Sequence, residues 1–282
     1  MRLMSIASGS SGNCIYVGNG NTNVLVDAGI SAKRIGEGLN ALGLSLSDIE
    51  AVFITHEHSD HISALPVLAR RHHLPLYATK GTIDALLNGK NKTGIDPSLF
   101  TEVCPDNPVT VNDITVDPIR VSHDAADPVC YRFFSASQTD TGDERASAAV
   151  CTDLGVYDDY IIDRLKGVSA LLLEANHDIR MLEAGPYPYF LKRRISGEKG
   201  HLSNDTAGEL LSSLMEDSKL KTVLLGHLSQ ENNYPALAFE TVRMQLKMTG
   251  HECSGSMEKS RDTVNLGIAP RDVPGTLINI DF

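Results

Sequence analysis

Tryptophan is absent from this sequence of 282 residues, and aromatic residues of all kinds make up only 5% of it. No run of apolar residues approaches the length of about 20 that a helix needs to cross a bilayer. The first residues, Met1 to Ser5, lead into no apolar stretch of signal-peptide length. From these absences we expect a cytoplasmic protein without a membrane span.

Cysteine and positive charge are also scarce. The five cysteines are odd in number and widely spaced, and no two form a Cys-x-x-Cys pair, which favours reduced thiols over a disulfide framework. Acidic residues outnumber basic ones, 36 against 25, for a formal net charge of −11. The chain as a whole therefore lacks the basic character typical of nucleic-acid-binding proteins, although a local basic site is compatible with this balance.

A dense cluster of histidine and acidic residues is present at 55–62, with the sequence Thr-His-Glu-His-Ser-Asp-His-Ile. It follows a short apolar run that predicts a buried strand leading into a loop. On an extended segment, side chains two positions apart point to the same side, so His56 and His58 can face one ion. Asp60 and His61, where the chain turns, can face another. A solvated histidine-rich loop is the alternative, but such clusters at a strand end are typical of metal sites.

Sequence periodicity predicts an α/β protein. Strands are expected at 2–7, 14–17, 23–26, 109–111, 114–121, 129–134 and 148–152, and the continuous apolar runs at 168–173 and 222–225 are typical of strands buried on both faces. Helical spacing occurs at 31–42, 62–72, 82–87, 158–165, 204–215 and 235–249. No linker or shift in composition divides the chain, so we predict one domain over 1–282, built of two β-then-α halves at about 1–130 and 131–282.

A Ser/Gly tract at 8–13 separates the first two predicted strands. Consecutive backbone amides in such loops can bind anions, which would make the tract a phosphate loop. It lacks the Gly-Lys-Ser/Thr ending of a nucleotide P-loop, so we favour the alternative of a simple turn.

Three more potential ligands follow predicted strands, as the first cluster does. His123 comes after the strand at 114–121, and Asp153 and His227 come after two later strands. Taken singly, a residue in such a position is more often an ordinary hydrogen-bonded side chain. Together with the four in the cluster they make seven ligands, which suits two ions of four to five coordination that share a carboxylate.

These residues resemble the five motifs of the metallo-β-lactamase superfamily, in order and at plausible spacing; the motifs are the segments 26–29 and 55–61, then His123, Asp153 and His227. Within the superfamily the chain is most similar to the YycJ (WalJ) group of bacterial exonucleases, through further segments at 8–14, 123–128, 174–178, 200–204 and 226–233. The resemblance implies a four-layer αββα sandwich, with the metals at one edge where the two sheets meet.

The resemblance also implies a ligand set for two divalent ions, of Zn, Mn or Fe. The residues that would hold the first ion are His56, His58 and His123, those for the second are Asp60, His61 and His227, and Asp153 would bridge both. Asp27 would orient the histidine loop, since ligating imidazoles normally donate their other N–H to such a partner. A turn aspartate that only ends a strand is the alternative for Asp27.

The chemistry so implied is hydrolysis by a metal-bridging hydroxide, without a serine or cysteine nucleophile. Asp60 could also take the proton of the water. The segments 174–176 and 200–201 resemble the Glu-Ala-Thr and Gly-His motifs of tRNase Z, which implies that Glu174 orients His201 and that His201 protonates the departing 3′ oxygen. For the adjacent His177, a surface position is the alternative to a functional one.

The metal site alone leaves the substrate open, because phosphodiesters, thioesters and lactams are all cleaved on this scaffold. Basic side chains precede His201, at Lys192, Arg193, Arg194 and Lys199, and clustered Lys and Arg are the usual phosphate contacts. With the resemblance, they favour an exonuclease that acts on DNA rather than RNA, in the 5′ to 3′ direction. A solvated loop is the alternative for these cations. The aromatic residues of 186–190 could stack bases, although such clusters are more often core.

Two other functions stay open at this point. A thioester or lactone hydrolase of the glyoxalase II type would not need the basic residues. A non-catalytic metal-binding regulator of cell-wall or division pathways would not need an open two-metal site. Redox chemistry of the flavodiiron kind is disfavoured, because those proteins place an acidic ligand where His58 stands and carry a flavin domain.

Overall fold

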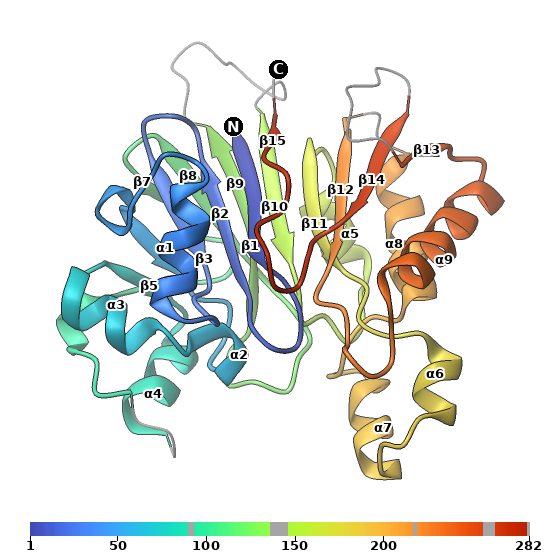
Figure 1. Ribbon diagram of the computed structural model, residues 1–282, viewed down its shortest axis with the longest axis horizontal. Coiled ribbons are helices and arrows are strands. Elements are labelled where there is room, and N and C mark those ends of the chain that lie inside the picture. The colour runs from blue at the N-terminus through green and yellow to red at the C-terminus, as the bar shows by residue number, and fades with distance from the viewer. Residues whose placement is uncertain (90–92, 136–145, 217–218, 256–262, 281–282) are drawn as a thin grey trace. The chain divides into compact units, whose positions relative to one another are not determined.

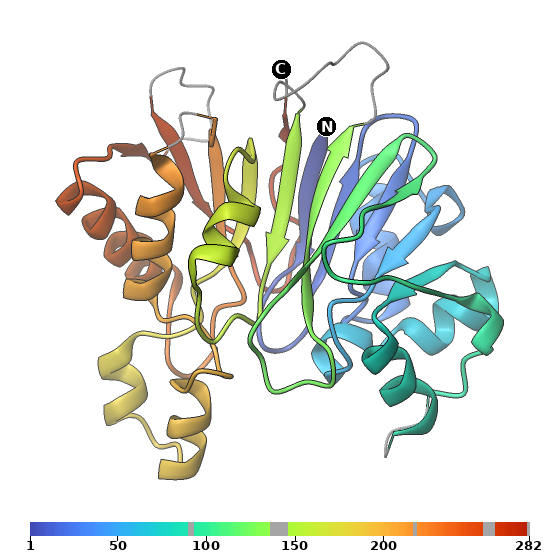
Figure 2. The ribbon, with the colours of Figure 1, turned by 180° about the vertical axis from the view of Figure 1, so that it is seen from behind.

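The computed structural model describes residues 1–89, 93–135, 146–216, 219–255 and 263–280. The chain forms two compact units, and Figures 1 and 2 show their helices and strands from opposite sides. The first unit contains Met1–Arg120, Ala125–Ala146 and Pro270–Phe282, and the second contains Val121–Asp124 and Ser147–Ala269. The organisation as a single domain of two halves stays a prediction.

The first unit contains a mixed sheet with the strand order β15-β1-β2-β3-β4-β5-β6. In that order the strands span Ile278–Asn279, Arg2–Ala7, Cys14–Gly18, Asn23–Val26, Ala51–Phe53, Leu76–Ala78 and Phe100–Glu102. Neighbours from β15 to β3 pair antiparallel, and neighbours from β3 to β6 pair parallel. The same unit has an antiparallel meander of β7 (Val109–Val111), β8 (Ile114–Arg120) and β9 (Val129–Ser135).

The helices of the first unit are α1 (Ala32–Asn40), α2 (Ser59–Ile62), α3 (Leu65–His72) and α4 (Lys80–Asn88), with 3₁₀ turns at Leu46–Asp48 and Pro97–Leu99. The prediction of one helix at 62–72 is wrong, because the segment is broken before α3. Pro66 lies in the first turn of α3 and has no N–H to continue a preceding helix. At the break, Ser63 Oγ donates to the carbonyl of Gly29 (2.6 Å). Asp60 and His61 therefore lie on a separate short helix.

Aromatic packing in the first unit fixes the end of β4. The ring of Phe53 lies 5.3 Å from that of Tyr131 and 6.0 Å from that of Phe133, both edge-on. The buried hydroxyl of Tyr131 donates to the carbonyl of Ile54 (2.8 Å), so this polar group is satisfied in an apolar environment. The two residues before the histidine-rich loop are thus held in place, Phe53 by aromatic packing and Ile54 by a hydrogen bond.

The second unit contains parallel strands in the order β13-β14-β12-β11-β10. These strands span Cys253–Ser254, Val264–Ile268, Thr222–Gly226, Ala170–Glu174 and Ser147–Cys151. Every residue of β11 is buried, as the apolar run predicted. Glu174 lies opposite Gly226 in the register, and Cys151 lies opposite Leu173. The strands therefore end at the same edge, one or two residues from Asp153 and His227.

The helices of the second unit are α5 (Asp159–Leu165), α6 (Ile179–Ala184), α7 (Tyr189–Ile195), α8 (Asn204–Met215) and α9 (Pro235–Met248). Both ribbon views show α6 and α7 beyond the ends of β11 and β12, whereas α8 and α9 lie along the strands (Figures 1 and 2). Among the described residues, none of the helices combines the length and the apolar character needed to cross a membrane.

Candidate metal centre

Asp27 holds both ends of the histidine-rich loop that follows β4. It lies directly after β3 in a left-handed backbone conformation (φ 61°). Its buried carboxylate accepts from Thr55 N (2.8 Å), Thr55 Oγ1 (2.9 Å) and His61 Nδ1 (2.7 Å). Burial raises the pKa of Asp27, although the adjacent His61 acts to lower it. These contacts give Asp27 the geometry of a residue that orients a ligating imidazole.

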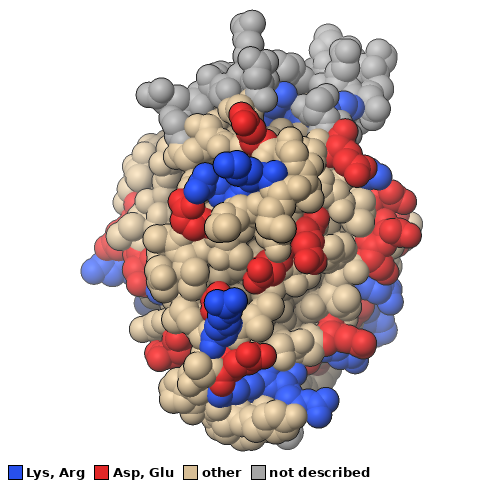
Figure 3. All heavy atoms as spheres, turned by 90° about the vertical axis from the view of Figure 1, so that its right-hand side faces the viewer, with Lys and Arg blue, Asp and Glu red and all other residues tan. Residues whose placement is uncertain are grey.

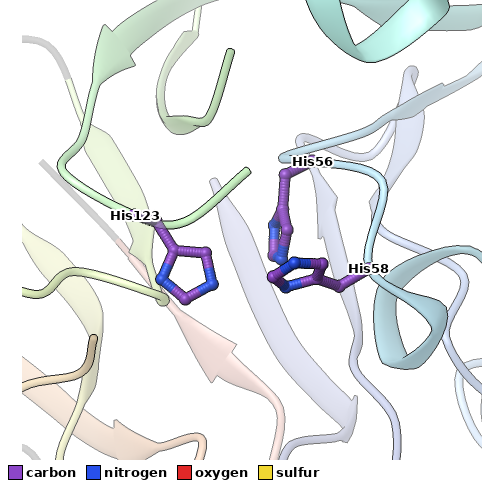
Figure 4. Close-up of side chains that lie close together, drawn as sticks. All are labelled: His56, His58 and His123. Atoms are coloured by element: carbon purple, nitrogen blue, oxygen red, sulfur yellow. The ribbon is translucent and has the colours of Figure 1, made fainter. Parts of the chain in front are cut away.

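Three imidazoles gather on this loop. The ring centroids of His56 and His58 are 4.5 Å apart and those of His56 and His61 are 4.3 Å apart. Figure 4 shows His56 and His58 side by side. Asp60 Oδ2 lies 3.4 Å from His61 Nε2. The two pairs expected from the strand alternation, His56 with His58 and Asp60 with His61, each lie close together, and His56 also lies beside His61.

The Ser/Gly tract supports the loop and is a turn, as favoured from the sequence. Its amides are used within the chain, because Gly12 N donates to Gly9 O (2.9 Å) and Asn13 N donates to Asp60 O (2.8 Å). The Asn13 amide caps the turn by bonding Gly9 N (3.0 Å) and Gly9 O (3.1 Å), and its Nδ2 lies 3.2 Å from His61 Nε2. Sequence reasoning missed this site residue, although a buried Asn in a Ser/Gly turn is a usable signal.

In the second unit, the buried carboxylate of Glu174 connects two histidines. Its Oε1 accepts from Nδ1 of His201 (2.8 Å) and from Nδ1 of His227 (2.7 Å). Its Oε2 accepts from the backbone N–H groups of Leu154 (3.0 Å) and Leu202 (3.2 Å). The contact with His201 is the one that the resemblance implies. No pattern in the sequence indicates the second bond, to His227.

The pKa values of Glu174 and His201 are shifted by the charges of their neighbours. Burial alone would raise the pKa of Glu174, but the charges and hydrogen bonds of His201 and His227 lower it. Burial would likewise lower the pKa of His201, but the negative charges of Glu174 and Asp153 raise it. The paired charges therefore favour the carboxylate form of Glu174 and the protonated form of His201.

Asp153 and His123 lie at the same place in the second unit. Asp153 and His227 follow β10 and β12 in left-handed conformations (φ 59° and 53°). Asp153 Oδ1 is 3.6 Å from Nδ1 of both His201 and His227, and 3.5 Å from Nε2 of His123. Donor atoms of Asp153, Glu174, His201 and His227 all lie within 4.8 Å of one another. His123, labelled in Figure 4, donates from Nδ1 to the carbonyl of Gly200 (2.9 Å).

The chemistry of these donors fits divalent metal ions. In His61, His123 and His227, Nδ1 is bonded to an oxygen that only accepts, so Nδ1 carries the hydrogen and Nε2 has the lone pair that could hold a metal ion. Burial lowers the pKa of His123, which favours the neutral ring that ligation requires. Imidazole and carboxylate donors of this kind suit Zn, Mn or Fe.

Comparison with known proteins identifies the family. A family model described as a β-lactamase superfamily domain matches residues 22–227. The chain is 37% identical over 245 residues to exodeoxyribonuclease YycJ of Bacillus anthracis, covering 87% of this chain and 89% of the relative. It is 38% identical over 245 residues to exodeoxyribonuclease WalJ of Streptococcus pneumoniae, covering 86% of each. This chain belongs to the metallo-β-lactamase superfamily.

The fold agrees with that membership. The crystal structure of the metallo-β-lactamase fold protein YhfI from Bacillus subtilis matches with a TM-score of 0.65 at 16% identity, over 99% of both chains. The predicted αββα fold class is confirmed. As a superfamily member with these His and Asp clusters, the chain is a metal-dependent hydrolase.

The four basic residues before His201 in this metallo-β-lactamase superfamily member differ in their surroundings. Arg194 Nε and Nη2 donate to the two carboxylate oxygens of Asp124 (2.5 Å and 3.0 Å), and Asp124 Oδ1 lies 3.4 Å from His123 Nε2. Lys192 Nζ donates to the backbone carbonyl of Glu183 (2.6 Å). Arg193 and Lys199 are exposed. Arg194 thus supports the His123 segment, a role that the charge pattern did not indicate.

Buried asparagines join the segments that carry the site of the second unit. Asn233 Nδ2 donates to Ala175 O (2.9 Å) and to Asn204 Oδ1 (2.8 Å). Asn176 Nδ2 donates to the carbonyl of His227 (2.9 Å). His177 is buried as well, so its surface alternative is wrong, and burial lowers its pKa to about 4. The segments after β11 and β12 and the start of α8 are therefore held together by side-chain amides.

We expect Asn233→Ala to weaken metal affinity about tenfold to hundredfold, as the loss of an outer support of a metal site normally does. The cause is that the segment after β11 and the start of α8 lose their common donor. Titration with Zn or Mn measures the affinity. Ser212→Ala is the matched control, because that buried hydroxyl donates to Gly208 O within α8. Equal losses in both variants would mean that Asn233 only stabilises the fold.

Proposed function

We propose that this protein is an exonuclease that hydrolyses DNA phosphodiesters with two divalent metal ions, in the 5′ to 3′ direction. The hydrogen bond between His201 and Glu174 carries the proposal, since it holds an imidazole whose pKa is raised beside Asp153. An alkoxide leaving group needs such an acid, whereas the thiolate released from a thioester does not. The two relatives named exodeoxyribonuclease support DNA as the substrate.

We propose the ligand set that the superfamily motifs imply. The ligands of the first ion are His56, His58 and His123, those of the second are Asp60, His61 and His227, and Asp153 is shared. The convergence of donor atoms within each unit supports this set. When bound, the two ions supply an activated water and polarise the phosphate.

The other steps belong to the protein's own side chains. Asp60 accepts the proton of the attacking water. His201 donates a proton from Nε2 to the departing 3′ oxygen, because its Nδ1 is engaged by Glu174. Glu174 keeps its charge and stabilises the imidazolium. Asp27 holds His61 in the tautomer that ligates through Nε2.

We propose that Arg193 and Lys199 contact substrate phosphates, since both are exposed and precede His201. Arg194 and Lys192 assist indirectly by fixing α7 to Asp124 and to the backbone of α6. On the face shown in Figure 3, basic side chains lie in separate groups among acidic ones. Binding should therefore depend on a local contact surface rather than on one broad basic face.

End-labelled single- and double-stranded DNA and RNA, incubated with Mn or with Zn, test the function. A thioester and a lactone are assayed in parallel. Stepwise shortening of DNA from its 5′ end is the expected result. Hydrolysis of the thioester or lactone alone would replace the nuclease proposal with a small-molecule hydrolase. Metal binding without any hydrolysis would favour a non-catalytic regulator.

We expect gently purified protein to carry about two divalent ions per chain, on the ligand count. Elemental analysis of the protein measures them. Removal of the ions with a chelator should abolish hydrolysis, and Mn or Zn should restore it. Asp153→Ala should lower the content to less than one ion, because the shared ligand is lost. Full activity of wild-type protein with a single ion would exclude the dinuclear centre.

A further inference from the structure

We infer that α7 is a stacking platform for unpaired bases, so that the substrate of the site is the single-stranded end of a nucleic acid. The platform consists of Tyr189, Phe190 and Arg193. This inference rests on the proposed nuclease function and adds to it the class of strand that is bound.

The two aromatic rings of the platform are in solvent. Tyr189 is 75% exposed and Phe190 is 73% exposed, so the sequence-based alternative that this cluster is core is wrong for both. Exposure of two adjacent large rings is unusual in a chain in which aromatic residues make up 5%. Exposure of such rings to water is unfavourable, so large exposed apolar rings often mark the site where a partner binds.

A positively charged side chain, that of Arg193, lies beside the ring of Tyr189. Arg193 is one helical turn after Tyr189, and its guanidinium carbon lies 6.0 Å from the ring centroid. A base stacked on Tyr189 would place its own phosphate within reach of this cation. The combination of a flat apolar surface and a cation matches a nucleotide better than a wholly apolar partner. At the lower end of Figure 3, over α6 and α7, basic side chains lie beside uncharged surface.

The platform is connected to the site within the second unit. Phe190 is one turn before Arg194, so the two side chains share a face of α7. Arg194 bonds Asp124, which lies 3.4 Å from His123 Nε2. On the C-terminal side of α7, Ser122 Oγ donates to Glu198 O (2.8 Å). A base on Phe190 would therefore lie one helical turn from the ion pair that contacts a proposed ligand.

Stacking chemistry selects for unpaired bases. Inside a duplex both faces of a base are covered by its neighbours, so a protein ring can stack only on a base that is single-stranded or terminal. Aromatic stacking on a base is tolerant of sequence, because every base has a π-face. A blunt duplex end offers only its terminal base pair, whereas a single-stranded end offers successive bases to the two rings. The platform therefore predicts a preference for single-stranded ends without a preference for their sequence.

Binding of fluorescent single-stranded DNA to the metal-loaded protein tests the platform, in a His201→Ala background that slows cleavage. Tyr189→Ala with Phe190→Ala should weaken binding of a normal strand by about tenfold or more. The same double substitution should not change the affinity for a strand whose end is abasic, since that end has no base to stack. Phe190→Trp should retain binding, whereas Phe190→Leu should lose it. Met248→Ala is the control, being 78% exposed on α9 of the same unit.

The outcomes separate this inference from the nuclease function. If wild-type protein cleaves DNA but the platform variants bind normal strands as tightly as wild type, the platform is wrong and the function stands. If the variants lose affinity for abasic and normal strands alike, α7 contacts only the backbone and stacking is excluded. If wild-type protein cleaves neither normal nor abasic DNA strands, the proposed nuclease function itself fails, and the platform as a substrate site fails with it.

Discussion

Replacing His201 by alanine should lower kcat on DNA by about 10²- to 10⁴-fold, the usual contribution of a general acid. The metal content should not change, because Nδ1 of His201 is engaged by Glu174 and its Nε2 is assigned to the leaving group. A phosphodiester with a p-nitrophenolate leaving group needs little acid assistance, so its hydrolysis should fall far less. Steady-state kinetics on both substrates and elemental analysis check this result.

The pH dependence provides a second test of the same residue. The pKa of His201 is raised, since the charges of Glu174 and Asp153 outweigh the effect of burial, which opposes them. Activity that needs the imidazolium is therefore present below this raised pKa and is lost as the pH rises through it. That alkaline decline should be missing in His201→Ala. His177→Ala is the matched histidine control, and a larger loss there than in His201→Ala would assign the acid to His177.

Glu174→Gln should have an even larger effect than His201→Ala. One carboxylate oxygen accepts from two histidines, and the other accepts from two backbone amides. A glutamine amide keeps only one of the two acceptor oxygens, so two donors are left unsatisfied at a cost of about 1–3 kcal/mol each. We expect loss of the acid at His201 together with a decrease of about tenfold to hundredfold in metal affinity, because His227 loses its orientation.

The comparison that decides this prediction is with Glu57→Gln. Glu57 lies on the histidine-rich loop and accepts from Ala126 N (2.8 Å), a bond that a glutamine oxygen can also accept. This variant should keep both metal and activity. Metal affinity of Glu174→Gln equal to that of wild type would show that Glu174 does not orient His227. Thermal unfolding of both variants separates a local effect from a loss of fold.

Local sequence was sufficient where a residue's role follows from its neighbours along the chain. The apolar run before Thr55 predicted β4, and those at 168–173 and 222–225 predicted β11 and β12, because strands buried on both faces need continuous apolar sequence. The helical spacing at 31–42 likewise predicted α1, whose start is capped by the Ser31 hydroxyl as it accepts from Arg34 N. The break before α3 was missed, although Pro66 signals it.

Residues joined across long stretches of sequence were harder to predict. The pairing of Arg194 with Asp124 spans 70 residues, and that of Glu174 with His227 spans 53. No periodicity connects such positions, because their proximity results from strand order and loop paths. The sequence therefore assigned Arg194 to phosphate binding from its charge, its position before His201 and the family resemblance, without its partner.

The sequence by itself determined the chemical class of this protein, since a set of imidazoles and carboxylates at strand ends has few uses besides holding metal ions. It also determined the order of the motifs that identify the superfamily. Only the tertiary structure decided which nitrogen of His61, His123 and His227 carries the hydrogen, that Arg194 is paired with Asp124, and that the rings of α7 are in solvent. These properties depend on hydrogen-bond partners and burial, and both are set by residues far away in the chain.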